Sequence, residues 1–499
     1  MRRLLTTLAI LAAAALAAAG CGGDDSSGGA LESALAYVPA DTPFVVALET
    51  DVDGEQYQAL DDILGRFPGG DSVKQRLLQE LEEGEERVSY EEDVKPLLGN
   101  PFVVSGTDAA SLIESEGDTP FIGALQVGDA DALDRLIEKT KPEERGETAG
   151  ATVYGDDGSF FAVEDDMVVF ADSEDVLESA LERADGDDHL DVETFEEGLQ
   201  GLPEENLARA YVDLQALIEQ DPDTQAARRV EWVAALRTLG MTATASGDAV
   251  EVDFNLRTEG GDLSDEDLPL AAGDEAAQVV RIPGEVGFAL RDPSQLVAFF
   301  ESAFQAIEPQ SFGDYETGKR AISQRFGIDV DEDLFGQLTG DLSISVAVSG
   351  AFGARAEVSD PQAFRRTVDR LADALPQLGA GLGVTDVARR GELYEARLVD
   401  GGSFVFGSLG DVFVAGSDAA RARLMASRDP EDVQDASGSL VAAADAEQVA
   451  LRVLQQVAPQ LGLGGLFGGG LFARPLDELT GSMATSTDGM RGSFRLTLD

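Results

Sequence analysis

The stretch GSFFAVEDDMVVFADSED, residues 158–175, consists of two short apolar runs separated by an acidic turn. Apolar runs of this length on either side of a turn predict a β-hairpin. Ser173 follows the second run and is itself followed by two acidic residues, which is a common start of a helix. The pattern returns as GSFVFGSLGDVFVAGSDA, residues 402–419. The chain is therefore predicted to contain the same hairpin and helix twice.

Three further blocks recur in the same order and at nearly the same spacing, which indicates an internal duplication. The blocks of the first half are YVPADTPFVVAL (37–48), GALQVGDADALDRLI (123–137) and LRTLGMTATASGDAVEVDFNL (236–256), and they return at 280–291, 354–368 and 476–496. The alignment sets Pro39 over Pro283 and Phe44 over Phe288. Each half, at roughly 225 residues, has a plausible domain size.

The first half reads as strands interrupted by single helices. Strands are predicted at 44–49, 102–105, 121–127, 152–154, 159–163, 167–171, 207–212, 241–245 and 250–256. Amphipathic helices are predicted at 56–67, 72–82, 130–139, 174–183 and 225–239. Successive hairpins with helices between them predict an α+β fold with two tandem related domains, each a largely antiparallel sheet with packed helices.

The only cysteine, Cys21, lies at the border between an apolar segment and a polar one. Arg2 and Arg3 precede an uncharged run from Leu4 to Ala19, which is the layout of a secretory signal peptide and is too short for a stable membrane span. Small residues directly before Cys21 resemble the lipobox of bacterial lipoproteins, although the usual leucine three places before the cysteine is Ala18 here. The resemblance implies cleavage before Cys21 and lipidation of its thiol.

An ordinary cleaved signal with a stray cysteine is the alternative. Two features favour the anchor: there is no second cysteine for a disulfide, and residues 22–30 are polar and glycine-rich, as a tether would be. The predicted organisation is a lipoprotein signal peptide at 1–20, a flexible tether at 21–30, a first α+β repeat at 31–260, an acidic linker at 261–275 and a second α+β repeat at 276–499. The expected location is extracytoplasmic, at the membrane that holds the lipidated Cys21.

Several of these segments, taken together, resemble a known family. YVPADTPFVVALETD, DVKPLLGNPFVV, DLFGQLTGDLSISV and the hairpin at residue 158 are similar to the bacterial domain-of-unknown-function family DUF3352, which contains exported proteins and lipoproteins. The resemblance extends over essentially the whole chain after the signal peptide. It implies an envelope location and supplies no catalytic residues.

The chain is strongly acidic, with 95 acidic and 36 basic residues and a net charge of −59. This charge argues against nucleic-acid binding, which needs a basic surface, and against electrostatic docking on anionic lipid. Disorder is the other explanation of so much charge, but 43% hydrophobic residues and clear periodicity argue for a folded body. We expect a solvated acidic surface; whether that surface also binds calcium is left open.

Two segments resemble ligand-binding loops and then depart from them. GDYETGKR (313–320) has the glycine and lysine of a phosphate loop, but Arg320 replaces the serine or threonine that would hold magnesium. DVDED (329–333) begins like a calcium loop, but Leu334 replaces its glycine and Gly340 its final glutamate. We therefore predict no nucleotide site and no EF-hand, and interpret Lys319 and Arg320 as helix surface.

No arrangement of residues identifies an enzyme. The single histidine, His189, is interpreted as a loop residue rather than a metal ligand, and serine-hydrolase signatures are missing. Trp232 is interpreted as core. We predict no catalytic residues, no metal site and no cofactor. The leading hypothesis is a non-enzymatic binding or interaction module for an unknown protein or hydrophobic ligand. The alternatives are a carrier of a lipid or other hydrophobic molecule and, more remotely, a carboxylate-dependent hydrolase.

One apolar stretch stands out in the second half. LGLGGLFGGGLFARP, residues 461–475, lies in a segment without charge from Val453 to Ala473. Its dense glycines oppose a helix, so its apolar side chains are predicted on a loop that either contacts lipid or a partner or covers the protein's own core. The candidate contact residues are Leu461, Leu463, Leu466, Phe467, Leu471 and Phe472.

Overall fold

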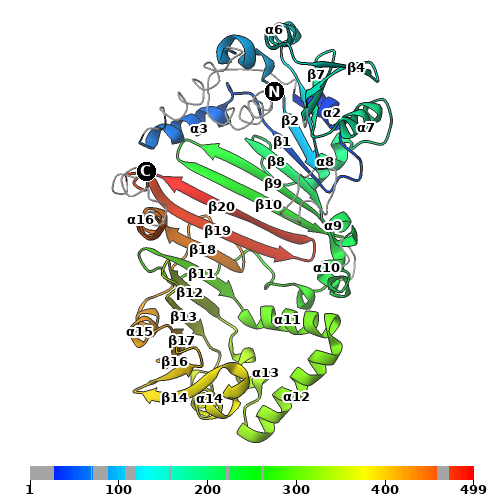
Figure 1. Cartoon of the computed structure of the whole chain (residues 1–499). Helices are drawn as coiled ribbons and strands as arrows, with labels where there is room; N and C mark the ends of the chain where they lie inside the picture. Colours follow the sequence, from blue (N-terminus) through cyan, green and yellow to red (C-terminus); the bar gives the residue numbers. More distant parts are fainter. Residues whose placement is uncertain are drawn as a thin grey trace. The chain divides into compact units, whose positions relative to one another are not determined.

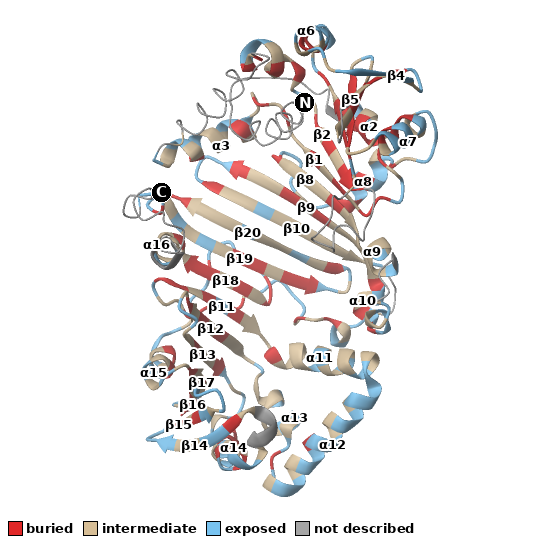
Figure 2. Cartoon of the chain, in the orientation of Figure 1, coloured by how far each residue is buried: buried red, intermediate tan, exposed pale blue. Residues whose placement is uncertain are grey.

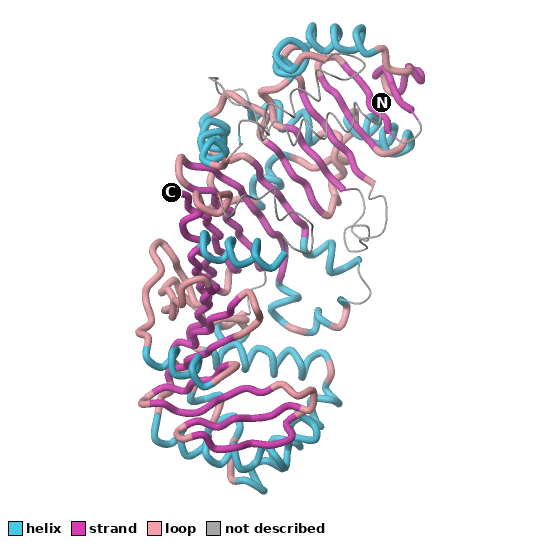
Figure 3. Tube along the Cα trace, turned by 60° about the vertical axis from the view of Figure 1, so that its left-hand side comes forward, coloured by secondary structure: helices cyan, strands magenta, loops and turns pink. Residues whose placement is uncertain are grey.

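The computed structural model describes residues 27–68, 70, 88–106, 120–156, 159–220, 224–259, 263–457 and 471–499 (Figure 1). The chain divides into two compact units. Unit 1 comprises Met1–Thr224 and Arg237–Arg257, and unit 2 comprises Gln225–Leu236 and Thr258–Asp499. Each unit contains an antiparallel sheet with helices packed against it, and Figure 3 shows how helices and strands alternate along the chain.

The sheet of unit 1 has the strand order β10-β9-β8-β1-β2-β3-β7-β6-β5-β4. Its strands are β1 (Phe44–Leu48), β2 (Phe102–Gly106), β3 (Phe121–Gln126), β4 (Glu144–Thr148), β5 (Ala151–Asp156), β6 (Ser159–Glu164), β7 (Met167–Ala171), β8 (Ala208–Asp213), β9 (Leu236–Ser246) and β10 (Ala249–Thr258). One core packs α2 and α7 against one side of β1, β2, β3 and β7, where Val45, Val103 and Ile122 are almost fully buried.

The sheet of unit 2 repeats this order as β20-β19-β18-β11-β12-β13-β17-β16-β15-β14. Its strands are β11 (Glu285–Arg291), β12 (Asp341–Ala347), β13 (Phe352–Glu357), β14 (Val384–Arg390), β15 (Leu393–Leu398), β16 (Ser403–Leu409), β17 (Val412–Gly416), β18 (Leu440–Asp445), β19 (Leu476–Ser486) and β20 (Gly489–Leu498). Even the register shift between β4 and β5 has a counterpart between β14 and β15.

The helices follow from local sequence signals. Unit 1 has α2 (Ser27–Leu35), α3 (Glu55–Arg66), α6 (Ala130–Thr140), α7 (Glu174–Ala184), α8 (Val192–Gly198), α9 (Leu214–Gln220) and the short turns η1 (Tyr90–Val94) and η2 (Lys95–Leu97). Unit 2 has α10 (Glu231–Ala235), α11 (Pro293–Ile307), α12 (Pro309–Phe326), α13 (Val330–Asp333), α14 (Pro361–Leu382), α15 (Ala419–Ser427) and α16 (Ala446–Val457), with η4 (Ala227–Arg229), η5 (Asp265–Asp267) and η6 (Phe335–Gln337).

Capping side chains set several of these helix starts. Ser173 caps α7 and Asp418 caps α15, each by accepting a hydrogen bond from a backbone N–H in the first turn. The carboxylates of Asp213 and Asp445 accept hydrogen bonds from the backbone N–H groups of Ala216 and Gln448. They therefore cap α9 and α16, which begin directly after β8 and β18. The same strand–cap–helix step therefore occurs in both units.

The predicted α+β class with antiparallel sheets is confirmed, and two local predictions are corrected. Of the helix predicted at 225–239, only Glu231–Ala235 is α-helical, after the short turn Ala227–Arg229, and Leu236 already begins β9. The predicted tether at 21–30 overlaps α2, in which Ala30 and Leu31 are buried. Trp232 is buried, as interpreted. The domain boundaries stay predictions.

Candidate functional site

The two faces of the unit 2 sheet differ in burial. On the face that we call the closed face, Ala289, Ser345, Val441 and Ala443 are almost fully buried. Helices α15 and α16 lie on this side, because Met425 of α15 approaches Gly353 and Arg452 of α16 approaches Gly284. Alternate residues of the same strands point to the opposite, open face, and Figure 2 shows these strands as a mixture of buried, intermediate and exposed positions.

The open face of β12, β11, β18, β19 and β20 is made of apolar side chains in cross-strand register. Three rows run across the strands: Val346–Val286–Ala444–Leu479–Leu496, Ile344–Phe288–Ala442–Gly481–Phe494 and Leu342–Leu290–Leu440–Met483–Gly492. No residue in these rows is charged or carries a polar side chain. Helix α14 packs on this side of the sheet farther along, where Phe364 packs edge-on against Phe413 of β17.

Three large side chains of this face are exposed to solvent. Phe288 is 40% exposed, Leu479 is 41% exposed and Phe494 is 51% exposed. Phe288 and Leu479 lie beside the small side chains of Ala442 and Ala444 of β18, and Phe494 lies opposite Gly481 of β19. The Phe494 ring lies over Gly481, since a Cβ built on that glycine would be 2.8 Å from the ring. Ala444 itself is only 2% exposed, so the accessible part of this face consists mainly of the three large side chains.

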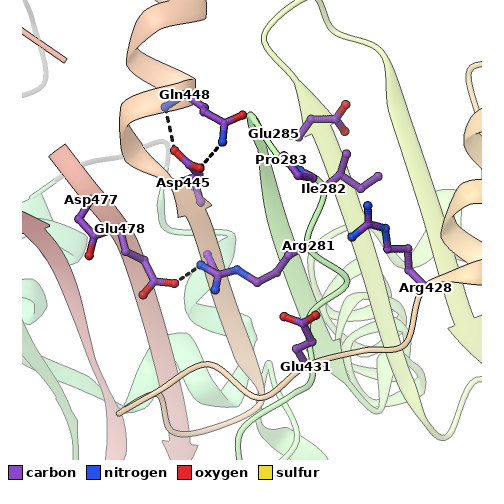
Figure 4. Close-up of a pocket in the computed structure, with 12 residues that line it drawn as sticks. Arg281, Ile282, Pro283, Glu285, Arg428, Glu431, Asp445, Gln448, Asp477 and Glu478 are labelled. Atoms are coloured by element: carbon purple, nitrogen blue, oxygen red, sulfur yellow. Dashed lines mark hydrogen bonds and ion pairs between the residues drawn. The ribbon is translucent and has the colours of Figure 1, made fainter. Parts of the chain in front are cut away.

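The closed face holds a second candidate, a polar cavity of about 390 Å³ (Figure 4). It lies where β11, β18 and β19 meet the first turn of α16. Its lining residues are Arg281, Ile282, Pro283, Glu285, Arg428, Glu431, Ala443, Ala444, Asp445, Gln448, Asp477 and Glu478. Most of its charged groups already have protein partners, as the following contacts show.

Three interactions fix the walls of the polar cavity. Arg281 forms an ion pair with Glu478, and Asp445 accepts hydrogen bonds from both the backbone and the side chain of Gln448. Glu285 is only 6% exposed, and its carboxylate accepts hydrogen bonds from both terminal nitrogens of Arg421. It also accepts a hydrogen bond of 2.7 Å from the Ser345 hydroxyl. The hydrogen bond to Glu285 raises the pKa of Arg421 above its usual range. The cavity walls are thus held by internal ion pairs, which is a structural role.

The structure places the residues that the sequence singled out as follows. Cys21, Leu461, Leu463, Leu466 and Phe467 lie outside the described residues. Leu471 and Phe472 are described, and their side chains are 41% and 37% exposed. The contact-loop prediction therefore stays a prediction.

The interpretation of Lys319 as a helix-surface residue is wrong, because its side chain is buried. It is on α12, only 8% exposed, and its ammonium group contacts Glu301, Glu316 and Asp331 at 2.6–3.0 Å. The segment 313–320 is helical throughout, so it forms no phosphate loop. Asp329 caps α13 and Asp331 pairs with Lys319, so these acids of DVDED have structural partners. The ring of His189 lies in a loop and contacts the Gly186 carbonyl.

Among the described residues, no three histidine, cysteine, aspartate or glutamate side chains converge as metal ligands would. Within the same ranges, no helix has both the length and the apolar character needed to cross a bilayer.

Sequence reasoning missed Phe288, Ala442, Leu479, Gly481 and Phe494. The alternation in β19 and β20 was a signal, because Leu479, Gly481 and Met483 alternate with Glu478, Thr480 and Ser482. The sequence did not reveal which residues of three other strands lie opposite them.

Comparisons with known proteins identify a family and no role. The profile of the family described as "Protein of unknown function (DUF3352)" matches residues 4–382, about three quarters of the chain. No protein of curated function matches. Crystal form III of TP0453 aligns with 46% of this chain and 82% of its own at 10% identity and a TM-score of 0.27. Crystal form IV of the same protein aligns with 45% of this chain and 80% of its own length, at 10% identity and a TM-score of 0.26. TM-scores this low carry no structural or functional argument.

Proposed function

The chain belongs to the DUF3352 family, as its sequence motifs indicated, and because that family has no assigned role we propose a function from the site itself. We propose that this protein is a lipid-anchored, extracytoplasmic envelope protein without enzymatic activity that binds a hydrophobic molecule on the open face of unit 2. The observation that carries the proposal is the three-row apolar surface with Phe288, Leu479 and Phe494 exposed.

The composition of the open face favours an apolar ligand. Its three rows lack charged and polar side chains, although 26% of all residues are charged. The backbone groups of β11, β12, β18 and β19 are engaged with neighbouring strands on both sides, so a peptide cannot bind there as an added strand. The remaining source of affinity is removal of apolar surface from water, at about 25 cal/mol per Å².

The size of the open face favours a small molecule over a protein. Five strands spaced about 4.8 Å apart, with three rows two residues apart, cover an area of about 500 Å². A stable protein interface buries about 800 Å² on each partner. A surface of about 500 Å² is comparable with the largest apolar patches of monomers, which are often functional. The proposed occupant is therefore a hydrophobic ligand rather than a second copy of the chain or a protein partner.

The remaining elements of the proposal rest on the sequence and on the partners of the charged groups. Cys21 supplies the membrane anchor, with no nucleic acid, nucleotide or cofactor involved. The carboxylates of Glu285 and Glu478 are occupied by Arg421 and Arg281, which supports a structural role rather than the acid–base role of a hydrolase. Replacing Cys21 with alanine is expected to release the protein from membranes or to leave its signal uncleaved; unchanged membrane fractionation would refute the anchor.

The binding test uses the mature chain carrying Cys21→Ala, so that no covalent lipid competes. Lipids extracted from the purified protein are identified by mass spectrometry, and binding of the fluorescent fatty acid cis-parinaric acid is titrated. We expect Phe288→Asp with Leu479→Asp to abolish binding. Val399→Asp is the matched control, since Val399 is 73% exposed and lies outside the three rows. Equal binding by both variants would refute the open face as the site.

A further inference from the structure

Helix α11 of unit 2 is apolar and yet buries almost none of its side chains. Six of its 15 residues are Leu, Val, Phe or Ile, and Glu301 is its only charged residue. Within this helix only Pro293 is buried, and Phe300 is 61% exposed. Figure 2 shows α11 and α12 with mostly intermediate and exposed positions along their length. A helix of this composition is normally covered, so α11 presents an uncovered apolar face.

The apolar face of α11 is continuous along the helix. Leu296, Phe300 and Phe304 lie four residues apart, and Ile307 follows at the next turn, so these side chains form one stripe. Helix α12 covers the end of the stripe, where the ring of Phe304 packs edge-on against that of Phe312 at 5.8 Å. Phe300 lies one turn before this contact, and most of its surface faces solvent.

The helix at the same place in unit 1 is packed and acidic. Helix α3 follows β1 as α11 follows β11, and it buries Tyr57 and Ile63, each only 4% exposed. It also carries three acidic residues and one arginine. In α11 the single carboxylate, that of Glu301, is paired with Lys319 at 3.0 Å and accepts a hydrogen bond of 2.6 Å from the Tyr315 hydroxyl. The apolar face of α11 therefore lies on a helix whose one charge is already compensated.

The size and shape of this face decide between possible occupants. A helix of 15 residues is about 22 Å long and about 10 Å wide, so one face covers about 220 Å². A stable protein interface needs about 800 Å² on each partner. A small hydrophobic ligand needs a concave site, whereas the outside of a helix is convex. A bilayer needs neither a large area nor a concave site, because an amphipathic helix sinks into it by its apolar side.

We infer that α11 contacts a lipid bilayer through the face that carries Leu296 and Phe300, with the Phe300 ring entering the apolar layer. The inference rests on the proposed function for one element, the anchor at Cys21, and adds a second membrane contact to it. An anchored chain meets the bilayer at a high effective concentration, so a contact of small area is sufficient. Because the chain has a net charge of −59, this contact favours a neutral bilayer over an anionic one.

The first test replaces the lipid anchor by a tag. The mature chain with Cys21→Ala and an N-terminal hexahistidine tag is bound to phosphatidylcholine vesicles that contain a nickel-chelating lipid. In Phe300→Trp, brominated phosphatidylcholine is expected to quench at least half of the added tryptophan fluorescence. Val399→Trp is the matched control, since Val399 is 73% exposed and lies at the opposite end of the strands from the start of α11, and almost no quenching is expected there. Equal quenching at both positions, or quenching at neither, would refute the contact.

The second test measures the contribution of the Phe300 side chain. The untagged mature chain with Cys21→Ala is sedimented with phosphatidylcholine vesicles. Phe300→Ser is expected to reduce binding at least fivefold, Phe300→Leu to retain most of it, and Val399→Ser to leave it unchanged, with circular dichroism as the check of folding. Vesicles of phosphatidylglycerol should bind less protein at low salt. Binding that Phe300→Ser leaves intact in a folded protein, or stronger binding to phosphatidylglycerol, would refute the inference.

The possible outcomes separate this inference from the proposed function and from a protein partner. Vesicle binding that is lost in Phe288→Asp with Leu479→Asp but kept in Phe300→Ser would refute α11 as the contact and assign it to the open face. Self-association in analytical ultracentrifugation that Phe300→Ser abolishes, without any vesicle binding, would replace the bilayer by a second copy of the chain. Quenching at position 300 in a chain that binds no cis-parinaric acid would support this inference and refute the proposed function. Absent quenching with intact cis-parinaric acid binding would refute this inference alone.

Discussion

Units 1 and 2 share one strand order, yet their open faces differ in the size and exposure of their apolar side chains. Because Asp213 and Asp445 each cap the helix that follows the strand, Val212 of β8 corresponds to Ala444 of β18, and Ala210 corresponds to Ala442. Leu239, opposite Val212, is of intermediate exposure, whereas Leu479, opposite Ala444, is exposed. The same strand order thus carries two different apolar surfaces.

The residues beside Ala210 and Ala442 differ as well. In unit 1, Ala210 lies between Val46 of β1 and Met241 of β9. In unit 2, Ala442 lies between Phe288 and Gly481. Val46 and Met241 are both of intermediate exposure, whereas Phe288 is exposed. This register also corrects the alignment of Phe44 with Phe288, because Phe44 lies opposite Val212 and Phe288 lies opposite Ala442.

A second difference lies on the buried side of the sheets. Ser105 and Ser345 are both fully buried. In unit 1 the partner of Ser105 is the hydroxyl of Thr42, whereas in unit 2 the partner of Ser345 is Glu285, which also binds Arg421. Counted from the caps of α7 and α15, Arg421 corresponds to Val176, which packs on the apolar core. Unit 2 thus has a charged pair where unit 1 is apolar.

The largest expected effect comes from breaking that charged pair. Arg421→Met leaves the Glu285 carboxylate buried without a counter-charge, and we expect a loss of about 3–5 kcal/mol in the free energy of unfolding. Urea titration followed by the fluorescence of Trp232, the only tryptophan and part of unit 2, measures it. The double variant Glu285→Leu with Arg421→Met, which imitates unit 1, should recover most of the loss. A single variant as stable as the parent would contradict this reading of the pair.

A smaller effect is expected from the connection between β11 and β12. Lys319 joins α11, α12 and α13 through Glu301, Glu316 and Asp331, but these acids are partly exposed to solvent. Because solvent screens such pairs, Lys319→Met should reduce the free energy of unfolding by about 1–3 kcal/mol. Arg320→Met, on the exposed side of the same helix, should change it by less than about 0.5 kcal/mol. In unit 1 the β1–β2 connection contains the pair Lys95–Asp53, whose lysine is more exposed than Lys319 and has one acidic partner instead of three, so Lys95→Met should cost less than Lys319→Met.

These contrasts show which parts of the fold the sequence could predict. Strand alternation and recurring blocks indicated the hairpins of both units, since they depend on residues close in the chain. The helix predicted at 225–239 was wrong in its last part, because Leu236 and Leu239 have the spacing of one helix face although both lie in β9. The recurrence of LRTLGMTATASG in the hairpin β19–β20 would have favoured a strand there.

The candidate site was less accessible to sequence reasoning for a physical reason. Ala442 and Gly481 are unremarkable small residues in their own strands, and they matter only because Phe288 and Phe494 stand beside them in register. The register that sets Phe288 beside Ala442 joins residues from strands far apart in the sequence, which no local pattern specifies. Arg421 and Glu285 likewise become a pair only when α15 lies on β11.

Copying the side chains of unit 2 onto unit 1 would sharpen the first comparison. The variant Val46→Phe, Val212→Ala, Met241→Gly places the residues found at 288, 444 and 481 on β1, β8 and β9. If these three side chains decide the difference, the stoichiometry of cis-parinaric acid binding should rise from one to two per chain. Isothermal titration calorimetry measures the stoichiometry, and circular dichroism checks the fold. A folded variant that still binds one molecule would show that other residues decide the difference.

The smallest effect is expected at alkaline pH, where the units differ in how they hold a buried tyrosine. Burial and a 2.6 Å hydrogen bond to Asp369 raise the pKa of Tyr394 to about 12 in unit 2, whereas burial with nearby Asp213 and Asp191 raises the pKa of Tyr211 to about 12 in unit 1. An unfolded tyrosine titrates near pH 10, so between about pH 10 and 12 the folded state binds more protons than the unfolded state. Stability is therefore fully present below pH 10 and falls as the pH rises through this window. Tyr394→Phe removes one of these groups, and the decrease in urea midpoint between pH 9 and 11, measured through Trp232, should be smaller than in the parent. An identical decrease in both proteins would show that Tyr394 does not contribute to the alkaline loss of stability.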